Sequence, residues 1–183
     1  MAMLRFPTIR SLFEAFPTAA DDIAVPAGDD DCIALLQALT AQEAWHPAVS
    51  LCAYILPRRE AVWWGCQSLR AARRLEPEED AILEAAEEWV RQPDEARRRL
   101  ALDLGTRSDA GLPGTWMAFA AGWSGGSIVP PDYAPVRPPP EQTARCVRAG
   151  LMIAIAQMPQ AEVPGAVGLC ITRGIALAVA GTP

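Results

Sequence analysis

Apolar side chains recur at helical spacing along most of this sequence, and this periodicity constrains its fold more than any other feature. Residues spaced i, i+3, i+4 and i+7 lie on one face of an α-helix. Two runs show the spacing clearly: Val49, Cys52, Ala53 and Leu56, and then Trp116, Phe119, Ala120 and Trp123. The pattern predicts an all-α fold, an irregular bundle of about seven to eight helices. No unit repeats at a fixed period, which argues against a regular solenoid of helical repeats.

Acidic residues and prolines predict where several helices begin. The aspartate triplet at residues 29–31 offers an N-cap and a negative first turn for a helix reaching about Ala44. A divalent-metal site at this triplet would need further oxygen ligands at defined spacing, and the neighbouring sequence offers none. Pro47 suits the first position of the next helix. Pro57 stops or kinks that helix and restarts it as another, which we expect to reach about Arg74.

Charged residues organise the middle of the chain. Pro77, with acids in the turn that follows, begins a helix whose acidic face suits an antiparallel hairpin with the basic end of the preceding helix. Pro93 begins another helix, for which Gly105 is a plausible C-cap. The arginine run at residues 97–99 either binds an anion or a partner's acidic patch, or forms a solvated face paired with acids of its own helix. The second interpretation is favoured.

A proline- and glycine-rich segment, residues 124–140, interrupts the helical pattern. It contains two glycines and six prolines, including Pro130-Pro131 and Pro138-Pro139-Pro140. Such a composition predicts extended, partly polyproline-like backbone. The segment is longer than most connections within compact domains. We expect a strap across the surface, a linker or a partner-binding element.

Two strongly apolar helices are expected after this loop, at residues 141–158 and 163–180. A membrane-spanning helix needs about twenty apolar residues with few charges. Pro159 and Glu162 interrupt the first candidate span, and Arg173 lies inside the second. We therefore expect both helices to belong to the core of a single helical domain, residues 1–183, without membrane insertion.

Charge and cysteine usage narrow the classes of partner and the cellular location. The net charge is −6, and the sixteen basic residues are all arginine. A net acidic chain without a clustered basic face is a poor nucleic-acid binder, because neutralisation of phosphates supplies most of that affinity. The five cysteines are scattered and form no CxxC pair, which is typical of reduced, buried thiols. Residues 1–16 lack the apolar stretch of a secretory signal peptide, so we expect a cytoplasmic protein.

The search for catalytic chemistry is mostly negative. Residues 122–126 spell the G-x-S-x-G nucleophile elbow, but that motif needs a preceding strand and a later histidine, and the sole histidine, His46, lies upstream. A dyad of His46 with Cys52 or Cys66 would need a depressed thiol pKa, whereas both cysteines lie on apolar helix faces. The sequence has no zinc-ligand spacing and no glycine-rich phosphate loop. We predict no catalytic residue, no metal and no cofactor.

The densest group of specific side chains lies just after Pro57. It comprises Arg58, Arg59, Glu60, Trp63 and Trp64 within the stretch Leu-Pro-Arg-Arg-Glu-Ala-Val-Trp-Trp. This motif and the overall layout resemble an uncharacterised, all-helical family of proteobacterial proteins, whose members are sometimes encoded near type VI secretion components. The resemblance implies no activity and contributes no catalytic residue.

The two adjacent tryptophans cannot face the same side of a helix, because neighbouring residues are about 100° apart. We expect Trp63, beside Val62 and Cys66, to pack in the core, and Trp64 to lie at the rim. Arg58 and Arg59 stand at a helix start, where the helix dipole disfavours positive charge. We therefore expect both to have partners, with Glu60, the acidic helix at residues 84–88 or an indole face as candidates.

These observations favour a non-enzymatic interaction protein, an accessory or adaptor with a protein partner and a link to a bacterial secretion system. Tryptophan and arginine are the residues that most often dominate binding surfaces. The five residues named above are its candidate binding site. The alternative is a small-ligand-binding protein or an enzyme of unknown class, with a pocket between the Trp63-Trp64 helix and the proline-rich loop. The oligomeric state is left open.

Overall fold

The structure, a computed structural model of the chain, describes residues 4–130 and 132–180. Within these residues the backbone forms ten α-helices and no β-strand, which confirms the all-α prediction. The number of helices exceeds the prediction in part because α2 has only five residues, too few to show a full apolar period. The helices are α1 (Ile9–Ala15), α2 (Ala19–Ile23), α3 (Cys32–Ala41), α4 (Trp45–Ile55), α5 (Arg58–Ala72), α6 (Pro77–Arg91), α7 (Glu95–Arg107), α8 (Pro113–Gly122), α9 (Gln142–Ala156) and α10 (Val163–Ala180).

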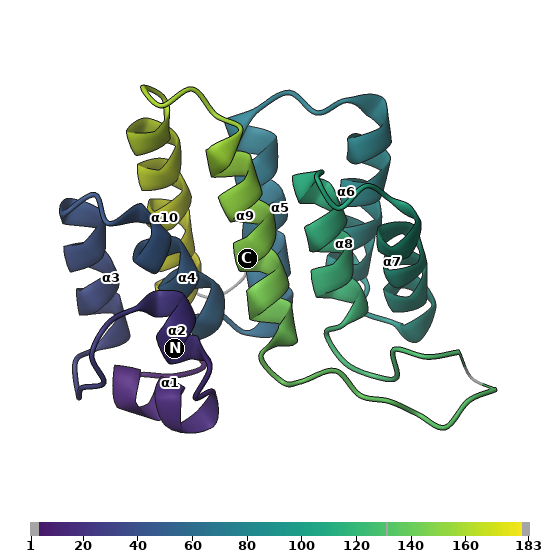
Figure 1. Cartoon of the computed structure of the whole chain (residues 1–183), viewed down its shortest axis with the longest axis horizontal. Helices are drawn as coiled ribbons and strands as arrows, with labels where there is room; N and C mark the ends of the chain where they lie inside the picture. The colour runs from purple at the N-terminus through teal and green to yellow at the C-terminus, as the bar shows by residue number, and fades with distance from the viewer. Residues whose placement is uncertain (1–3, 131, 181–183) are drawn as a thin grey trace.

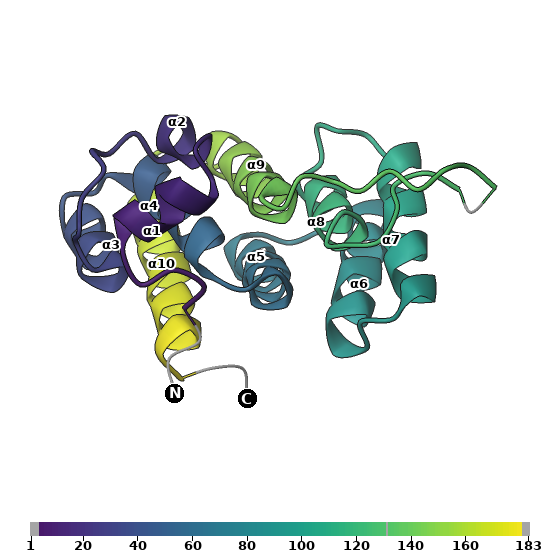
Figure 2. The ribbon, with the colours of Figure 1, turned by 90° about the horizontal axis from the view of Figure 1, so that it is seen from below.

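The helices form two groups on either side of a central pair (Figures 1 and 2). Helices α1 to α4 and α10 make one group, and α6, α7 and α8 make the other. Helices α5 and α9 lie between them, in contact with each other and with both groups. The stretch from Leu56 to Cys66 therefore starts a helix at the centre of the molecule.

Helix boundaries follow the capping chemistry of the sequence. Asp31 caps α3, where its carboxylate accepts the backbone N–H groups of Ile33 and Ala34 at 3.0 and 2.9 Å. This confirms the capping role of the aspartate triplet. Pro57 separates α4 from α5, also as predicted. Gly105 is not a C-cap: it lies buried inside α7, where an added Cβ would approach the Phe119 ring to 3.0 Å.

Helices α5 and α6 form the predicted antiparallel hairpin, and ion pairs join them. The Arg70 guanidinium binds both Glu87 oxygens, with Nε to Oε1 at 2.6 Å and Nη2 to Oε2 at 3.0 Å. It also binds Asp80 at 2.7 Å, and Arg73 pairs with Glu79 in the same interface. Because Glu87 is buried, water does not solvate its carboxylate, and the ion pair with Arg70 takes the place of that solvation.

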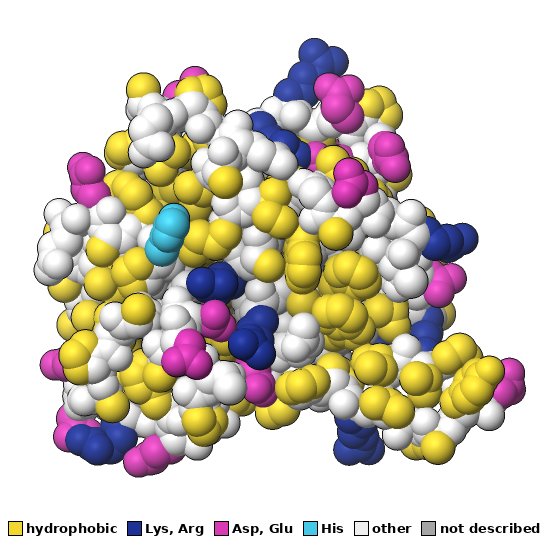
Figure 3. Space-filling view, viewed as in Figure 1, with side chains coloured by type: hydrophobic (Ala, Val, Ile, Leu, Met, Phe, Trp, Pro, Cys, Tyr) yellow, Lys and Arg dark blue, Asp and Glu magenta, His cyan; other side chains and the backbone are white. Residues whose placement is uncertain are grey.

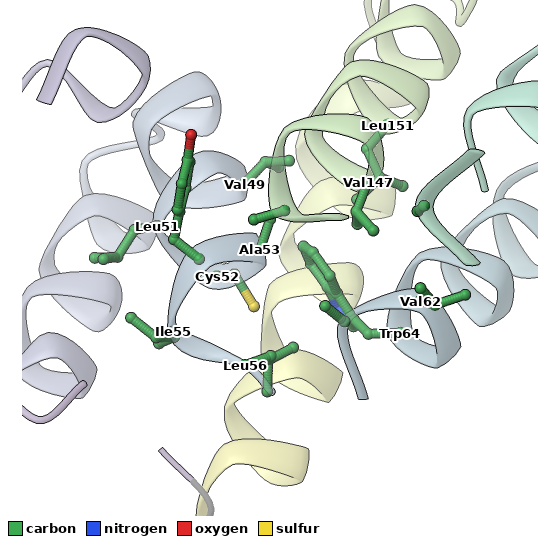
Figure 4. Close-up of a cluster of buried hydrophobic side chains, with 14 of the residues drawn as sticks. Val49, Leu51, Cys52, Ala53, Ile55, Leu56, Val62, Trp64, Val147 and Leu151 are labelled. Carbon is green, nitrogen blue, oxygen red and sulfur yellow. The ribbon is translucent and has the colours of Figure 1, made fainter. Parts of the chain in front are cut away.

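Trp64, and not Trp63, is the tryptophan in the core, so the prediction for this pair was wrong. The Trp64 side chain is 1% exposed and lies between α4 and α9 (Figure 4). Its indole N–H donates to the Cys170 carbonyl oxygen of α10 at 2.8 Å. Trp63 is half-buried, because it shares its helix stripe with the polar residues Arg59 and Gln67. That stripe faces solvent.

Helix α8 places small residues inward and large aromatic residues toward the surface. Its buried face includes Gly114, Ala118, Ala121 and Gly122. An added Cβ at Gly122 would lie 2.7 Å from the Leu102 Cβ, which shows how closely α7 and α8 approach each other. Trp116, Phe119 and Trp123 are partly exposed. Close helix packing thus limits the space on the buried face, where Met117 is the one large side chain among small ones, and the aromatic side chains lie outward.

The two apolar C-terminal helices, α9 and α10, pack against other helices of the molecule. Helix α9 contacts α4, α5 and α8, and α10 contacts α3, α4 and α5. Within residues 4–130 and 132–180, no helix has the length and apolar character needed to cross a membrane.

Candidate functional site: the proline-rich arm and its arginines

Arg58 connects both ends of the proline-rich segment to the start of α5. We call residues 124–140 the arm. The Arg58 guanidinium donates from Nη1 to the Ser124 carbonyl oxygen and from Nη2 to the Pro140 carbonyl oxygen, each at 3.0 Å. Pro57 fixes where α5 begins and so places Arg58 between the two ends of the arm. The predicted limits of the loop therefore coincide with the two carbonyl groups that Arg58 binds.

Two arginines of α7 hold the first half of the arm. Arg98, which is 4% exposed, donates to the Gly122 carbonyl oxygen and, at 2.9 Å, to that of Ser127. Arg99 donates to the Val129 carbonyl oxygen at 2.7 Å. These carbonyl groups precede or belong to backbone that forms no helix, so the guanidinium groups satisfy acceptors that would otherwise lack partners.

Glu95 of α7 balances the charge of both arginines. Its carboxylate accepts from Arg98 Nε and Nη2 at 2.7 Å and from Arg99 Nε at 2.9 Å. The hydrogen bonds from Arg98 and then those from Arg99 lower the pKa of Glu95 to about 2. The arginine run at residues 97–99 is therefore paired with acids of its own helix, as predicted, but it is not a solvated face, because Arg98 is buried and Arg98 and Arg99 bind the arm.

The arm extends beyond α7 and returns to α9 (Figures 1 and 2). Its two sides meet where the Ile128 N–H donates to the Val136 carbonyl oxygen at 2.8 Å and the Val136 N–H donates to Ser127 Oγ at 3.2 Å. Tyr133, beyond this point, is 68% exposed, and Val136 is 47% exposed. The arm is thus shaped by hydrogen bonds at its base while the side chains of Tyr133 and Val136 remain in solvent.

A strip of aromatic side chains on α8 leads into the arm. We call Trp116, Phe119 and Trp123 the aromatic strip. The Phe119 and Trp123 rings stack with centroids 4.6 Å apart, and Trp116 meets Phe119 edge-on at 5.9 Å. Hydrophobic side chains gather over α8 and continue over the arm in one view of the surface (Figure 3). The strip and the arm together form a largely apolar surface with a preorganised backbone.

The residues predicted as a binding site prove to connect α5 with its neighbours. Arg59 Nε donates to the Val90 carbonyl oxygen at 2.6 Å, in the last turn of α6 where positive charge suits the helix dipole. Glu60 is buried, Trp64 binds α10, and Trp63 packs at the rim of the core. The expectation that Arg58 and Arg59 have partners is confirmed. The acceptors are backbone carbonyl oxygens of residues far away in the sequence, which could not be identified from the sequence alone.

Sequence reasoning missed the part that Arg98 and Arg99 play in holding the arm. Their spacing from Glu95 predicted that these arginines pair with acids of their own helix, and so indicated only a solvated helix face. The length of the proline-rich segment was a usable signal. Proline lacks a backbone N–H, so the prolines of this segment cannot donate hydrogen bonds to carbonyl groups. A long segment of this kind needs donors from elsewhere, and guanidinium groups supply them.

The other candidate chemistry of the sequence is not assembled into a site. Burial raises the pKa of the Cys52 and Cys66 thiols well above the usual value, so neither is poised as a nucleophile. Ser124 of the G-x-S-x-G sequence follows helix α8 and not a strand. In the part of the chain that the structure describes, no three histidine, cysteine, aspartate or glutamate side chains cluster in a way that could hold a metal ion.

Comparison with known proteins gives a single relationship. The chain belongs to DUF6931, a family of unknown function, whose pattern matches residues 35–178. The match contains the arm, the aromatic strip and the three arginines that bind the arm. No curated protein and no solved structure matches the chain.

Proposed function

We propose that this member of DUF6931 is a non-enzymatic adaptor that presents the arm to a protein partner. The observation that carries the proposal is the way the arm is held. Three arginines bind four backbone carbonyl groups of the arm, and one of them also binds the Gly122 carbonyl group just before it, while Tyr133 and Val136 remain exposed. A segment fixed in shape before binding loses less conformational entropy when a partner engages it.

The chemistry of the arm indicates what kind of partner surface fits. Pro135 and Pro138 stand three residues apart, with Val136 and Arg137 between them. Segments of this type dock in aromatic-lined grooves, where the extended backbone is already close to its bound form. The partner we propose therefore carries an aromatic-lined groove for residues 135–138.

The aromatic strip extends the same proposed surface. Large aromatic side chains frequently anchor protein interfaces, since they bury much area with few rotatable bonds. The resemblance noted from the Leu-Pro-Arg-Arg-Glu-Ala-Val-Trp-Trp motif leads us to include components of a bacterial secretion system among the proposed partners, and a cytoplasmic site of action goes with that proposal.

Pull-down from the native host with three purified baits tests the proposal. The baits are the wild-type chain, a Tyr133→Ser, Val136→Ser double variant, and a Leu169→Ser control on α10, where Leu169 is 49% exposed. We expect the wild-type chain and the control to recover the same partner, and the double variant to lose it. A synthetic peptide of residues 132–140 should compete for that partner.

Equal recovery by all three baits would place the interface elsewhere and contradict the proposal. Recovery that the peptide does not reduce would also count against an arm-centred interface. Circular dichroism of each bait checks that the substitutions, all at exposed positions, leave the helical content unchanged.

A further inference from the structure

A hollow of about 290 Å³ lies between the base of the arm and the start of α5. Its lining comes from three places in the sequence: Arg58 of α5, residues 124–126 at one end of the arm, and Arg137, Pro138 and Pro140 at the other. The volume is at the small end for ligand sites in proteins. A small ligand seated here would touch both ends of the arm at once.

The lining of this hollow is positively charged. Arg58 and Arg137 both contribute guanidinium groups, and none of the lining residues is acidic. Within the described residues neither arginine has an ion pair with a carboxylate at 4.0 Å or less. Glu141, next to Pro140, instead accepts a hydrogen bond from Thr18. Two arginines without a neutralising acid are suited to an anion.

One further arginine and one acid lie near this charge. Burial, and after it the positive charge of Arg58, lowers the pKa of Arg5, and the negative charge of Glu141 partly offsets that lowering. Arg58 Nη1 and Nη2 each use one N–H for the arm carbonyl groups. A second N–H on each of these nitrogens is available to another acceptor.

Backbone donors line the same hollow. Among the described residues, the N–H groups of Gly125 and Gly126 donate to no other group of the chain. Gly126 has a φ of +63°, a conformation that favours glycine, and an added Cβ there would lie 3.0 Å from Arg98 Nε. Successive N–H groups in a turn containing a left-handed residue are typical of anion-binding backbone.

We propose that this hollow binds a small phosphate-bearing anion. Arg58 and Arg137 supply the charge and the paired donors, and the Gly125 and Gly126 amides supply uncharged donors from the opposite end of the arm. Guanidinium groups match the geometry of phosphate oxygens, and charge-assisted hydrogen bonds are the stronger kind. The bound anion joins the two ends of the arm and so reinforces the contact that Arg58 already makes between them.

Phosphate titration of the full-length chain, followed by NMR of the backbone amides, tests the site. We expect saturable shifts of the Gly125 and Gly126 amide signals with inorganic phosphate at constant ionic strength. Arg137→Gln should weaken phosphate binding about tenfold, because it removes one of the two charged donors. Arg137 is exposed and Arg58 remains, so this variant keeps the contacts that hold the arm.

Arg107→Gln is the matched control, since Arg107 is an exposed arginine of α7 whose ion pair is with Asp103. It should bind phosphate as the wild-type chain does. Equal affinities in the Arg137→Gln and Arg107→Gln variants would overturn the proposal, as would the same amide shifts on addition of sodium chloride alone. Phosphoserine peptide and nucleoside monophosphate, titrated next, distinguish a phosphorylated protein from a metabolite as the source of the phosphate group.

Discussion

Helix α5 carries two adjacent tryptophans and α8 is lined by two that are seven residues apart, and the structure uses the two pairs in different ways. In α5, Trp64 is fully buried and binds α10 through its indole N–H. In α8, Trp116 and Trp123 lie at the surface with Phe119 between them. The comparison teaches that the spacing of aromatic side chains shows which of them share a helix face. It does not show whether that face points inward.

The neighbours of each helix explain the difference. Gly174 of α10 faces Trp64, and an added Cβ there would lie 3.0 Å from the indole nitrogen, so a glycine makes room for the buried ring. Around α8 glycines lie on both sides of the contacts: Gly122 of α8 lets α7 approach the α8 backbone, and Gly105 of α7 lies against the Phe119 ring. The positions of small residues on neighbouring helices therefore decide where each large side chain fits.

The largest expected effect tests the buried half of this comparison. Trp64→Ala should lower the free energy of unfolding by about 3–5 kcal/mol, because it leaves a cavity and removes the hydrogen bond from the indole N–H to the Cys170 carbonyl oxygen. Trp63→Ala, one residue earlier, should lower it by about 1 kcal/mol or less, since Trp63 is at the rim. Urea unfolding of both variants measures the difference, and equal losses would contradict the assignment of Trp64 to the core.

A smaller effect is expected where α8 meets α7. Gly122→Ala should lower the free energy of unfolding by about 1–3 kcal/mol, because the new methyl group would overlap the Leu102 Cβ and Cα. Gly168→Ala is the matched control on α10, where nothing lies within 4 Å of an added Cβ. It should raise stability by about 0.5–1 kcal/mol through helix propensity. Thermal unfolding that ranks the two variants in the reverse order would show that α8 is not tightly packed.

For a substitution in the aromatic strip at the surface, we expect a modest loss of stability and a large loss of partner binding. Trp123→Ala removes the stacked contact with Phe119, which should lower the free energy of unfolding by about 1 kcal/mol. In the pull-down it should lose the proposed partner. A Trp123→Ala chain as unstable as Trp64→Ala would make the aromatic strip a structural element and not a binding surface.

The smallest effect concerns the charges that hold the arm. The pKa of Glu95 is lowered to about 2, so its stabilising interaction with Arg98 and Arg99 is present above the ordinary value of 4.5. It is lost as pH falls from about 4.5 through about 2. Glu95→Gln should flatten the loss of stability over this interval slightly, because the carboxylate is largely exposed and screened by solvent. Glu162→Gln, an exposed acid before α10, is the charge-matched control, and the same flattening in both variants would contradict the prediction.

Local rules of helix formation were sufficient for much of the fold. The cap at Asp31, the break at Pro57 and the start at Pro77 depend on contacts within a few residues, so the sequence alone determined them. The arm was also recognisable, because its prolines exclude a regular helix whatever surrounds them. The match to DUF6931, a family of unknown function, adds no chemistry from which a site could be predicted.

Only the tertiary structure decided which faces are buried and what the arginines bind. Trp63 and Trp64 are equally apolar neighbours, and the choice between them depends on a glycine of α10 more than one hundred residues later. Arg58 likewise reaches carbonyl groups 66 and 82 residues away along the chain. The sequence by itself determines which residues can cap a helix, break a helix or donate a hydrogen bond to a nearby group. Close approach between distant helices decides which residues share the core, hold the arm or line the hollow.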